Sequence, residues 1–239
     1  MIAKSLYALY AALLFTVFGF AALLAMILLP GLHRRRWLAR QAARAFLHLA
    51  GMPLTVHGLG HLPEGPCVLV ANHASYLDGV VFTAALPPRF GFVIKREMAS
   101  VPLAGLLLNR IGSQFMARDK AAQTTRDARR VMRSAASGQS IVFFPEGTFS
   151  EDPGLLKFHY GAFATAQRAG CPVVPAIIYG TRVALSPRGG LPCPTPLRIE
   201  ILEPLVPHSS GGSEGVAALC RQARNAILGK LQEPDLEAA

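Results

Sequence analysis

The chain begins with a long apolar stretch and then changes to an alternation of short apolar and polar runs. Residues 5–29 carry no charged side chain and are almost entirely apolar. As a helix they would reach about 37 Å, at about 1.5 Å per residue, which exceeds the roughly 30 Å hydrocarbon core of a bilayer. The pattern therefore predicts a membrane helix, able to span with some tilt, that ends at Pro30-Gly31.

A cleaved signal peptide is the alternative interpretation of this segment. Only Lys4 precedes the apolar run, the run is long for a signal peptide, and Arg34, Arg35 and Arg36 follow it closely. These features favour a retained anchor. Because the arginines lie on its C-terminal side, the positive-inside rule places the rest of the chain in the cytoplasm.

Residues 37–50 have helical spacing and predict an amphipathic second helix. The apolar positions recur three and four residues apart: Leu38, Ala42, Ala45, Phe46 and Leu49. The basic positions fall on another face: Arg36, Arg40, Arg44 and His48. Two interpretations remain open, a helix in the lipid headgroup layer and an ordinary helix packed on the domain with a solvated basic face.

Beyond Gly51, short apolar runs alternate with helical patterns, which is typical of α/β proteins. The expected strands are residues 67–71, 91–94, 114–117, 140–144, 173–179 and 197–202. The expected helices are residues 79–86, 101–109, 120–137, 161–169 and 214–231, followed by a frayed end at 233–239. We predict an α/β fold with a mixed, largely parallel sheet covered by helices. The domain would span residues 52–239, after a membrane anchor and amphipathic helix at residues 1–51.

The charge of the chain is concentrated near its start. The formal net charge is +10, and no Asp or Glu precedes Glu64. Such an excess suits either nucleic acid or an anionic membrane surface. The adjacent apolar segment favours membrane lipids, and no nucleic-acid-binding motif is present. The four cysteines have no CxxC spacing, which argues against a zinc site or a disulfide framework and fits a reducing, cytoplasmic environment.

A histidine and an aspartate follow the first expected strand, as His73-x4-Asp78. Histidine is the side chain best suited to accept a proton near neutral pH, and a neighbouring carboxylate can orient it and stabilise its charged form. The alternative is a structural histidine with a carboxylate at a helix start. For an isolated pair this alternative is the better one, so the hypothesis of catalysis depends on a second motif.

That second motif is Phe144-Pro145-Glu146-Gly147-Thr148, which again follows an apolar strand. Open α/β sheets bind ligands at the carboxyl ends of their strands, so the two motifs are expected to meet there. Glu146 is a candidate acceptor for a substrate hydroxyl. Gly147 would let the backbone approach a ligand, and Thr148 would donate to phosphate. The alternative is a plain turn with a surface glutamate.

The two motifs together, in this order and context, resemble the glycerolipid acyltransferases, whose best-known members are the 1-acylglycerol-3-phosphate O-acyltransferases. The resemblance covers residues 52–204. It implies transfer of a fatty acyl group from acyl-CoA or acyl carrier protein to a lysolipid hydroxyl, most simply that of 1-acylglycerol 3-phosphate, to give phosphatidic acid. His73 would be the base and Asp78 its partner. His57, His61 and His159 have no HExxH arrangement, so no metal is expected, and no cofactor beyond the acyl donor. With the arginines after the first helix, the site is expected on the cytoplasmic face of the cell (inner) membrane. Members of this family often begin with a helical pair that lies in one leaflet.

The same resemblance assigns further residues to the substrate. Residues 112–118 resemble the motif that binds glycerol phosphate, with Gly112, Phe115 and Arg118 as its members. Arg118 is the best candidate for a phosphate ligand, ahead of three other cations: Lys95, Arg96 and Lys157. For each cation the alternative is a solvated surface charge. Residues 173–177 resemble a fourth motif, and a buried edge strand with a proline explains them equally well.

One position departs from the pattern of the family. Glu-Gly-Thr is commonly followed by an arginine thought to bind phosphate, and here the residue is Phe149. A phenylalanine cannot make the bidentate hydrogen bonds of a guanidinium. Another acceptor is therefore an alternative, such as a lysophospholipid or a lyso-aminolipid like lyso-ornithine lipid. A lipid hydrolase or thioesterase is a more distant one, since Ser75 lacks the glycines of a nucleophile elbow. A membrane-binding module without catalysis is another.

Overall fold

The computed structural model describes residues 2–117, 121–207 and 212–237. Its strands are β1 Leu54–His57, β2 Val68–Ala71, β3 Phe90–Lys95, β4 Gln114–Met116, β5 Ser140–Phe143, β6 Val173–Tyr179 and β7 Leu197–Ile201. Within the described ranges they form a seven-stranded sheet in the order β1-β7-β6-β2-β5-β3-β4. The β6–β7 pair is antiparallel and the other neighbouring pairs are parallel. The predicted mixed, largely parallel α/β sheet is confirmed.

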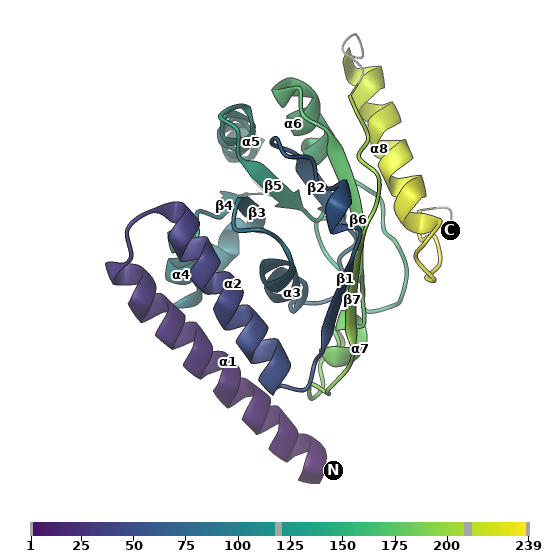
Figure 1. Cartoon of the computed structure of the whole chain (residues 1–239). Helices are drawn as coiled ribbons and strands as arrows, with labels where there is room; N and C mark the ends of the chain where they lie inside the picture. The colour runs from purple at the N-terminus through teal and green to yellow at the C-terminus, as the bar shows by residue number, and fades with distance from the viewer. Residues whose placement is uncertain (1, 118–120, 208–211, 238–239) are drawn as a thin grey trace.

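Helices cover both faces of this sheet (Figure 1). The α-helices are α1 Ile2–Leu28, α2 Leu32–Leu49, α3 Asp78–Ala85, α4 Ala104–Arg110, α5 Ala121–Ala136, α6 Gly161–Ala169, α7 Thr181–Ala184 and α8 Gly212–Leu228. Two short 3₁₀ helices, η1 Leu59–His61 and η2 Arg96–Ser100, lie after β1 and β3. One core lies between the sheet and α2 and α3, and the other between the sheet and α5, α6 and α8.

The central strand β2 shows why these sequences form a covered sheet. Successive side chains of a strand point to opposite faces. Leu69 and Ala71 are buried in the core beneath α2 and α3, whereas Val68 and Val70 are buried in the core beneath α5, α6 and α8. A parallel strand covered on both faces therefore reads as a continuous apolar run. The burial of both faces leaves only the strand ends accessible to a substrate.

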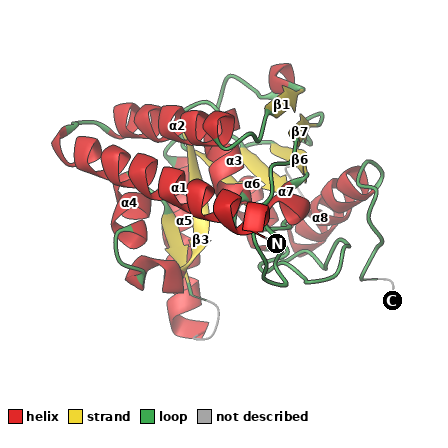
Figure 2. Ribbon diagram, turned by 90° about the horizontal axis from the view of Figure 1, so that it is seen from below, coloured by secondary structure: helices red, strands yellow, loops and turns green. Residues whose placement is uncertain are grey.

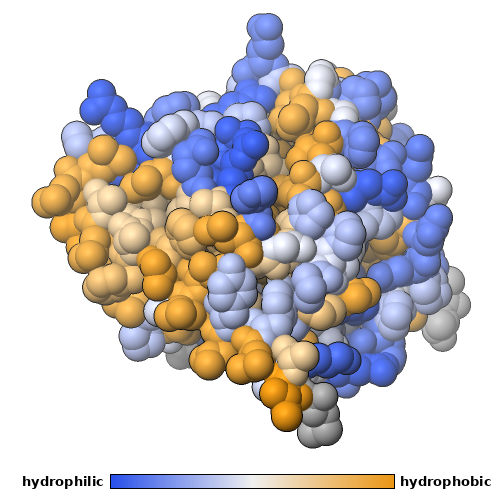
Figure 3. All heavy atoms as spheres, turned by 60° about the horizontal axis from the view of Figure 1, so that its bottom comes forward, coloured by the Kyte–Doolittle hydropathy of each residue, from blue (hydrophilic) through white to orange (hydrophobic). Residues whose placement is uncertain are grey.

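Helix α1 leaves most of its apolar side chains exposed. By length and composition it could cross a membrane, as predicted. It lies beside α2 (Figure 2). The rings of Phe15 and Phe46 make a T-shaped contact between the two helices, with centroids 5.5 Å apart. The Tyr7 hydroxyl donates to the Ala50 carbonyl at 2.8 Å. Figure 3 shows apolar side chains gathered over one side of the molecule, where α1 lies.

The buried face of α2 differs from the predicted one. Its buried residues are Arg36, Ala39, Ala43, Phe46 and Leu47. Leu49, expected in the apolar stripe, is 48% exposed, and Arg36, expected on the basic face, is 7% exposed. Alanines at several neighbouring positions made two stripes equally compatible with helical spacing. Packing against α3 selected one of them, so α2 packs on the domain through a face rotated from the expected one. The division of the chain at residue 51 stays a prediction.

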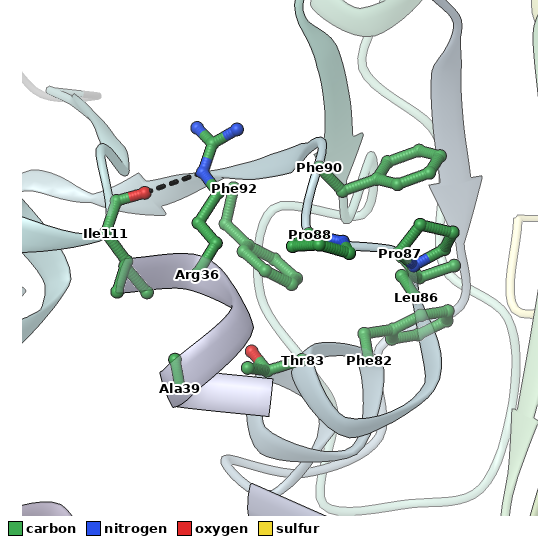
Figure 4. A pocket seen from close by; sticks show the side chains of 10 residues that line it. All are labelled: Arg36, Ala39, Phe82, Thr83, Leu86, Pro87, Pro88, Phe90, Phe92 and Ile111. Atoms are coloured by element: carbon green, nitrogen blue, oxygen red, sulfur yellow. Dashed lines mark hydrogen bonds between the residues drawn. The ribbon is translucent and has the colours of Figure 1, made fainter. Parts of the chain in front are cut away.

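Arg36 can be buried because backbone carbonyls accept its hydrogen bonds. Its Nε donates to the Ile111 carbonyl and its Nη1 to the Arg89 carbonyl, both at 2.9 Å. Figure 4 shows the side chain reaching from α2 to Ile111, where it helps to line a pocket that is otherwise mostly apolar. Burial lowers the pKa of Arg36 to about 10, so the group stays charged at neutral pH and fastens α2 to the loops before β3 and β4.

Three further expectations were incomplete or wrong. Strand β1 was not predicted, because its positions alternate between half-buried and exposed and form no apolar run. Helix α7 was not predicted, because its four residues are too few to show helical periodicity. Strand β6 lies inside the sheet between β7 and β2, so the interpretation as an edge strand is wrong. Its Pro175 lies opposite Leu202, beyond the end of β7, where the Leu202 N–H still donates to the Pro175 carbonyl at 2.8 Å. The missing proline N–H therefore removes one hydrogen bond at the end of that ladder.

The end of the chain is also more ordered than expected. Glu233 forms an ion pair with Arg182, and Asp235 forms one with Arg224. The expected fraying of 233–239 is therefore wrong for residues 233–237. Fraying was inferred from position and composition alone, and partners distant in sequence decided otherwise.

Candidate active site

The candidate site lies where β2 and β5, neighbours in the sheet, end at the same edge. Asn72 follows the end of β2, and its side-chain amide bonds to the backbone of Ile178 on β6. Its Nδ2 donates to the Ile178 carbonyl at 3.2 Å, and its Oδ1 accepts from the Ile178 N–H at 2.9 Å. These two hydrogen bonds fix the point at which the chain leaves the sheet, and His73 is the next residue. The sequence prediction that both motifs follow strands at one edge is confirmed by this arrangement.

The His73 imidazole is oriented by a buried carboxylate. Its Nδ1 lies 2.7 Å from Asp78 Oδ2. The same oxygen accepts the backbone N–H groups of Ala74 at 2.7 Å and Ser75 at 3.0 Å. Asp78 is the first residue of α3 and is fully buried, whereas 19% of the His73 side chain is exposed. With the Nδ1 proton donated to Asp78, Nε2 is the ring nitrogen that can accept a proton from a substrate.

Glu146 connects the two motifs. Its Oε1 accepts the His73 backbone N–H at 2.6 Å, and its Oε2 accepts the Leu156 backbone N–H at 2.8 Å. The residue is only 4% exposed. The sequence suggested a hydrogen bond between Glu146 and a substrate hydroxyl. In the structure both carboxylate oxygens instead accept hydrogen bonds from backbone N–H groups, so Glu146 holds the loop that carries His73. No sequence signal indicated this task, because it depends on two backbone groups distant in the chain.

The buried Glu146 carboxyl predicts a pH dependence of stability. Burial raises its pKa from 4.5 to about 7, against the opposing effect of the Leu156 and His73 N–H groups. The folded protein then holds a proton that the unfolded chain releases between these two values. The resulting stabilisation is complete below pH 4.5 and is lost as the pH rises through about 7.

We therefore expect the free energy of unfolding of the wild type to fall by about 3 kcal/mol, relative to that of Glu146→Gln, between about pH 4.5 and pH 8. Glutamine cannot titrate, so the variant removes this contribution and leaves those of the other groups. Urea unfolding in detergent at a series of pH values measures the difference. Parallel curves for the two proteins would contradict the assignment.

Aromatic side chains surround the imidazole. The Phe144 ring stacks on His73, with centroids 4.3 Å apart and an interplanar angle of 18°. The Phe149 ring meets His73 at 4.7 Å and 88°, and Tyr76 meets Phe149 at 4.8 Å and 87°. Gly147, with φ of +76° and its N–H donating to the Phe144 carbonyl at 3.0 Å, makes the turn that returns Phe149 to the histidine. Only glycine adopts that φ without strain. Thr148, at the tip of this turn, is exposed.

The other predicted substrate residues are spread along the sheet. Lys95 is exposed at the carboxyl end of β3. Phe115 is half-buried in β4, beside Ile94. Gly112 lies before β4, at the opposite end of that strand from the site edge, where a side chain would meet Leu32 on α2. The structure thus does not bring Gly112 to His73.

The remaining cations have different surroundings. Arg96 donates to Asp127, with its Nη2 2.6 Å from Oδ1. Lys157 is exposed and lies 3.9 Å from Glu237. Arg118 lies outside the described residues. Within the described ranges, no three His, Cys, Asp or Glu side chains are grouped as metal ligands.

The sequence profile of the family described as Acyltransferase matches residues 53–179, more than half of the chain. The chain belongs to that family. A chloroplastic 1-acyl-sn-glycerol-3-phosphate acyltransferase of Brassica napus is 34% identical over 72% of this chain and 49% of its own length. The enzyme of that name from Saccharomyces cerevisiae is 27% identical over 79% of this chain and 63% of its own. The chain thus spans about half to under two thirds of these relatives.

A lyso-ornithine lipid O-acyltransferase of Pseudomonas aeruginosa is 34% identical over 60% of this chain and 52% of its own length. Among solved structures, the 1-acyl-sn-glycerophosphate acyltransferase PlsC from Thermotoga maritima has a TM-score of 0.75. That similarity covers 96% of this chain and 95% of the other, at 21% identity. At this identity the similarity establishes a shared fold.

Proposed function

We propose that this protein is a membrane-associated O-acyltransferase that forms phosphatidic acid. It would move a fatty acyl group from acyl-CoA or acyl carrier protein to the free hydroxyl of 1-acylglycerol 3-phosphate. The observation that carries the proposal is the His73 imidazole, hydrogen-bonded to the buried Asp78 at the edge shared by β2 and β5. The names of the Brassica and Saccharomyces relatives support the choice of acceptor.

In the proposed reaction His73 Nε2 accepts the proton of the acceptor hydroxyl, and the oxygen attacks the thioester carbonyl carbon. Asp78 stabilises the imidazolium that forms. The carbon–sulfur bond then breaks, and the departing thiolate takes the proton from His73. The enzyme needs no covalent intermediate, because nucleophile and electrophile are two substrates held side by side. The acyl thioester is a co-substrate, and the proposal includes no metal or further cofactor.

The proposed location is the cytoplasmic face of the cell (inner) membrane. The apolar helix α1 would keep the site beside a substrate that remains in the bilayer. Arg36 is buried, so of the three consecutive arginines after α1 only Arg34 and Arg35 can lie among anionic headgroups. This holds whether α1 spans the bilayer or lies with α2 in one leaflet.

The proposal is tested by offering a panel of lysolipids, with acyl-CoA or acyl carrier protein as donor, to the purified full-length protein. We expect acyl transfer with a preference for 1-acylglycerol 3-phosphate. Transfer without that preference would contradict 1-acylglycerol 3-phosphate as the acceptor, and the protein would still be an acyltransferase. Fatty acid release at a rate independent of any acceptor would instead indicate a hydrolase. The absence of both activities would favour a non-catalytic membrane-binding module.

Phe149 favours a second candidate, an acyltransferase with an acceptor other than 1-acylglycerol 3-phosphate. The phenyl ring contacts the His73 ring directly, so no cation is available at that position to bind a phosphate. The similarity to a lyso-ornithine lipid O-acyltransferase supports this candidate. The same panel separates the two candidates, provided that it includes lyso-ornithine lipid and lysophosphatidylethanolamine.

Replacing Phe149 with arginine tests the role of this position. A guanidinium beside His73 would offer charge-assisted hydrogen bonds to a phosphate, each worth about 1.5–3 kcal/mol. We expect kcat/KM for 1-acylglycerol 3-phosphate to rise about tenfold relative to that for lyso-ornithine lipid. Phe149→Leu, which removes the ring and adds no charge, is the matched control and should leave the ratio unchanged. Equal changes for both acceptors in Phe149→Arg would show that the position does not select the acceptor.

A further inference from the structure

The connection between β5 and α6 carries two groups that the site requires and has no regular secondary structure of its own. It contains Phe149, which contacts the His73 ring, and Leu156, whose N–H donates to Glu146. Such a segment keeps one conformation only when other parts of the chain hold it. Residues 149–156 therefore depend on contacts with other parts of the chain.

The last described residues of the chain pair with this connection. The Leu155 N–H donates to the Pro234 carbonyl at 2.9 Å, and the Leu236 N–H donates to the Leu155 carbonyl at 3.1 Å. These bonds form a parallel bridge of one residue. The Gly154 N–H donates to Glu233 Oε2 at 2.7 Å. A side chain at Gly154 would overlap Leu236, so the two segments are in close contact.

Arg224, on α8, binds both segments at once. Its Nη2 donates to the Leu155 carbonyl at 3.1 Å and its Nε to the Leu156 carbonyl at 3.3 Å. Its Nη1 donates to Asp235 Oδ2 at 2.9 Å. Only 10% of the Arg224 side chain is exposed. The rigid fork of a guanidinium suits a site where several oxygen acceptors lie in fixed positions.

Arg182, on α7, repeats this arrangement at the other end of the connection. Its Nη1 donates to the Ser150 carbonyl at 2.7 Å, next to Phe149. Its Nη2 lies 3.2 Å from Glu233 Oε2, and 14% of the side chain is exposed. Each arginine thus fastens a residue of the C-terminal segment to a backbone carbonyl of the connection.

We propose that residues 233–237, held by Arg224 and Arg182, form a C-terminal brace that positions the catalytic histidine. The brace fixes Leu155 and Leu156, the Leu156 N–H fixes Glu146, and Glu146 fixes the backbone N–H of His73. Arg224 and Arg182 act in this proposal as positioning residues, through the connection and Glu146. The inference rests on the proposed acyl transfer only for its kinetic readout.

The test uses Arg224→Lys in the full-length protein, which keeps the charge and removes the fork. We expect kcat to fall about tenfold with KM for the acyl donor within about twofold, because the donor still binds and the base is misplaced. Arg182→Lys should give a smaller decrease in the same direction. Lys230→Gln is the matched control, because it breaks an exposed ion pair with Glu200, 3.5 Å apart, near the brace. Its kinetics should equal those of the wild type.

A double-mutant cycle separates positioning through Glu146 from a general loss of stability. If the brace acts through Glu146, Arg224→Lys should lower kcat much less in a Glu146→Gln protein than in the wild type. Additive effects, or a kcat within twofold of wild type for Arg224→Lys, would overturn the proposal. Should the wild type transfer no acyl group, the proposed function fails and the brace is still testable. The imidazole NMR titration of His73 should then differ between Arg224→Lys and Lys230→Gln, and identical titrations would overturn the brace.

Discussion

Replacing His73 with alanine should lower kcat for acyl transfer by about three orders of magnitude. A lipid hydroxyl is a poor nucleophile until a base accepts its proton, and Nε2 of His73 is the nitrogen left free by the hydrogen bond to Asp78. KM for the acyl donor should change little, because the proposed role of His73 is to accept the proton of the acceptor hydroxyl and not to bind the donor. Purified variant and wild type are compared in detergent or vesicles with the preferred acceptor of the panel.

The control for this variant is His57→Ala. His57 is an exposed histidine at the end of β1, so its removal changes the histidine content and leaves the site intact. Circular dichroism confirms that both variants are folded at the assay temperature. A His73→Ala protein that keeps more than a tenth of the wild-type kcat would exclude the histidine as the base. The mechanism, and not only a residue assignment, would then be wrong.

Asp78→Asn should reduce kcat at least as much, by about 10³- to 10⁴-fold. Asp78 Oδ2 accepts three N–H groups, from the imidazole, Ala74 and Ser75. An amide with its oxygen in this place keeps those hydrogen bonds and loses the charge that stabilises the imidazolium. An amide in the reversed orientation presents N–H groups to three donors and disturbs the loop. Either outcome removes the function of the pair.

Kinetics and structure together separate these two outcomes. A folded Asp78→Asn protein with a low kcat and an unchanged KM for the acyl donor indicates the loss of charge stabilisation. Asp78→Glu is the companion variant, because it keeps the charge and moves the carboxylate by about one methylene. We expect it to recover part of the lost rate. If kcat of Asp78→Asn stays within tenfold of the wild-type value, the carboxylate serves only as a favourable charge at the start of α3.

The pairing of His73 with Asp78 was predictable because both residues belong to one short segment. Five residues after the histidine, at the start of a helix, a carboxylate can turn back to the chain that precedes it. The hydrogen bonds of Glu146 to His73 and Leu156 were not predictable, because they depend on the sheet order that places β5 next to β2. For the same reason the sequence could name Phe149 as a departure and could not show that it contacts the histidine.

The sequence predicted the burial of charged side chains least well. The sequence predicts a solvated or lipid-facing Arg36. In the structure its side chain is buried on the inner face of α2, where two carbonyls from distant loops accept its hydrogen bonds. No sequence pattern distinguishes Arg182 or Arg224 from a solvated surface charge. Both are largely buried between the C-terminal segment and the connection after β5. A charged side chain is buried where acceptors converge on it, and that convergence comes from the tertiary fold.

The sequence alone determined the class of fold, the apolar first helix, the two motifs at strand ends and the resemblance to acyltransferases. These are local properties, since hydrophobic periodicity and short spacings are set by residues near one another in the chain. The tertiary structure decided the face on which α2 packs, the inner position of β6, the aromatic walls around His73 and the support of its loop by the C-terminal segment. Those features depend on contacts between residues far apart in sequence, which only the order of strands and the packing of helices bring together.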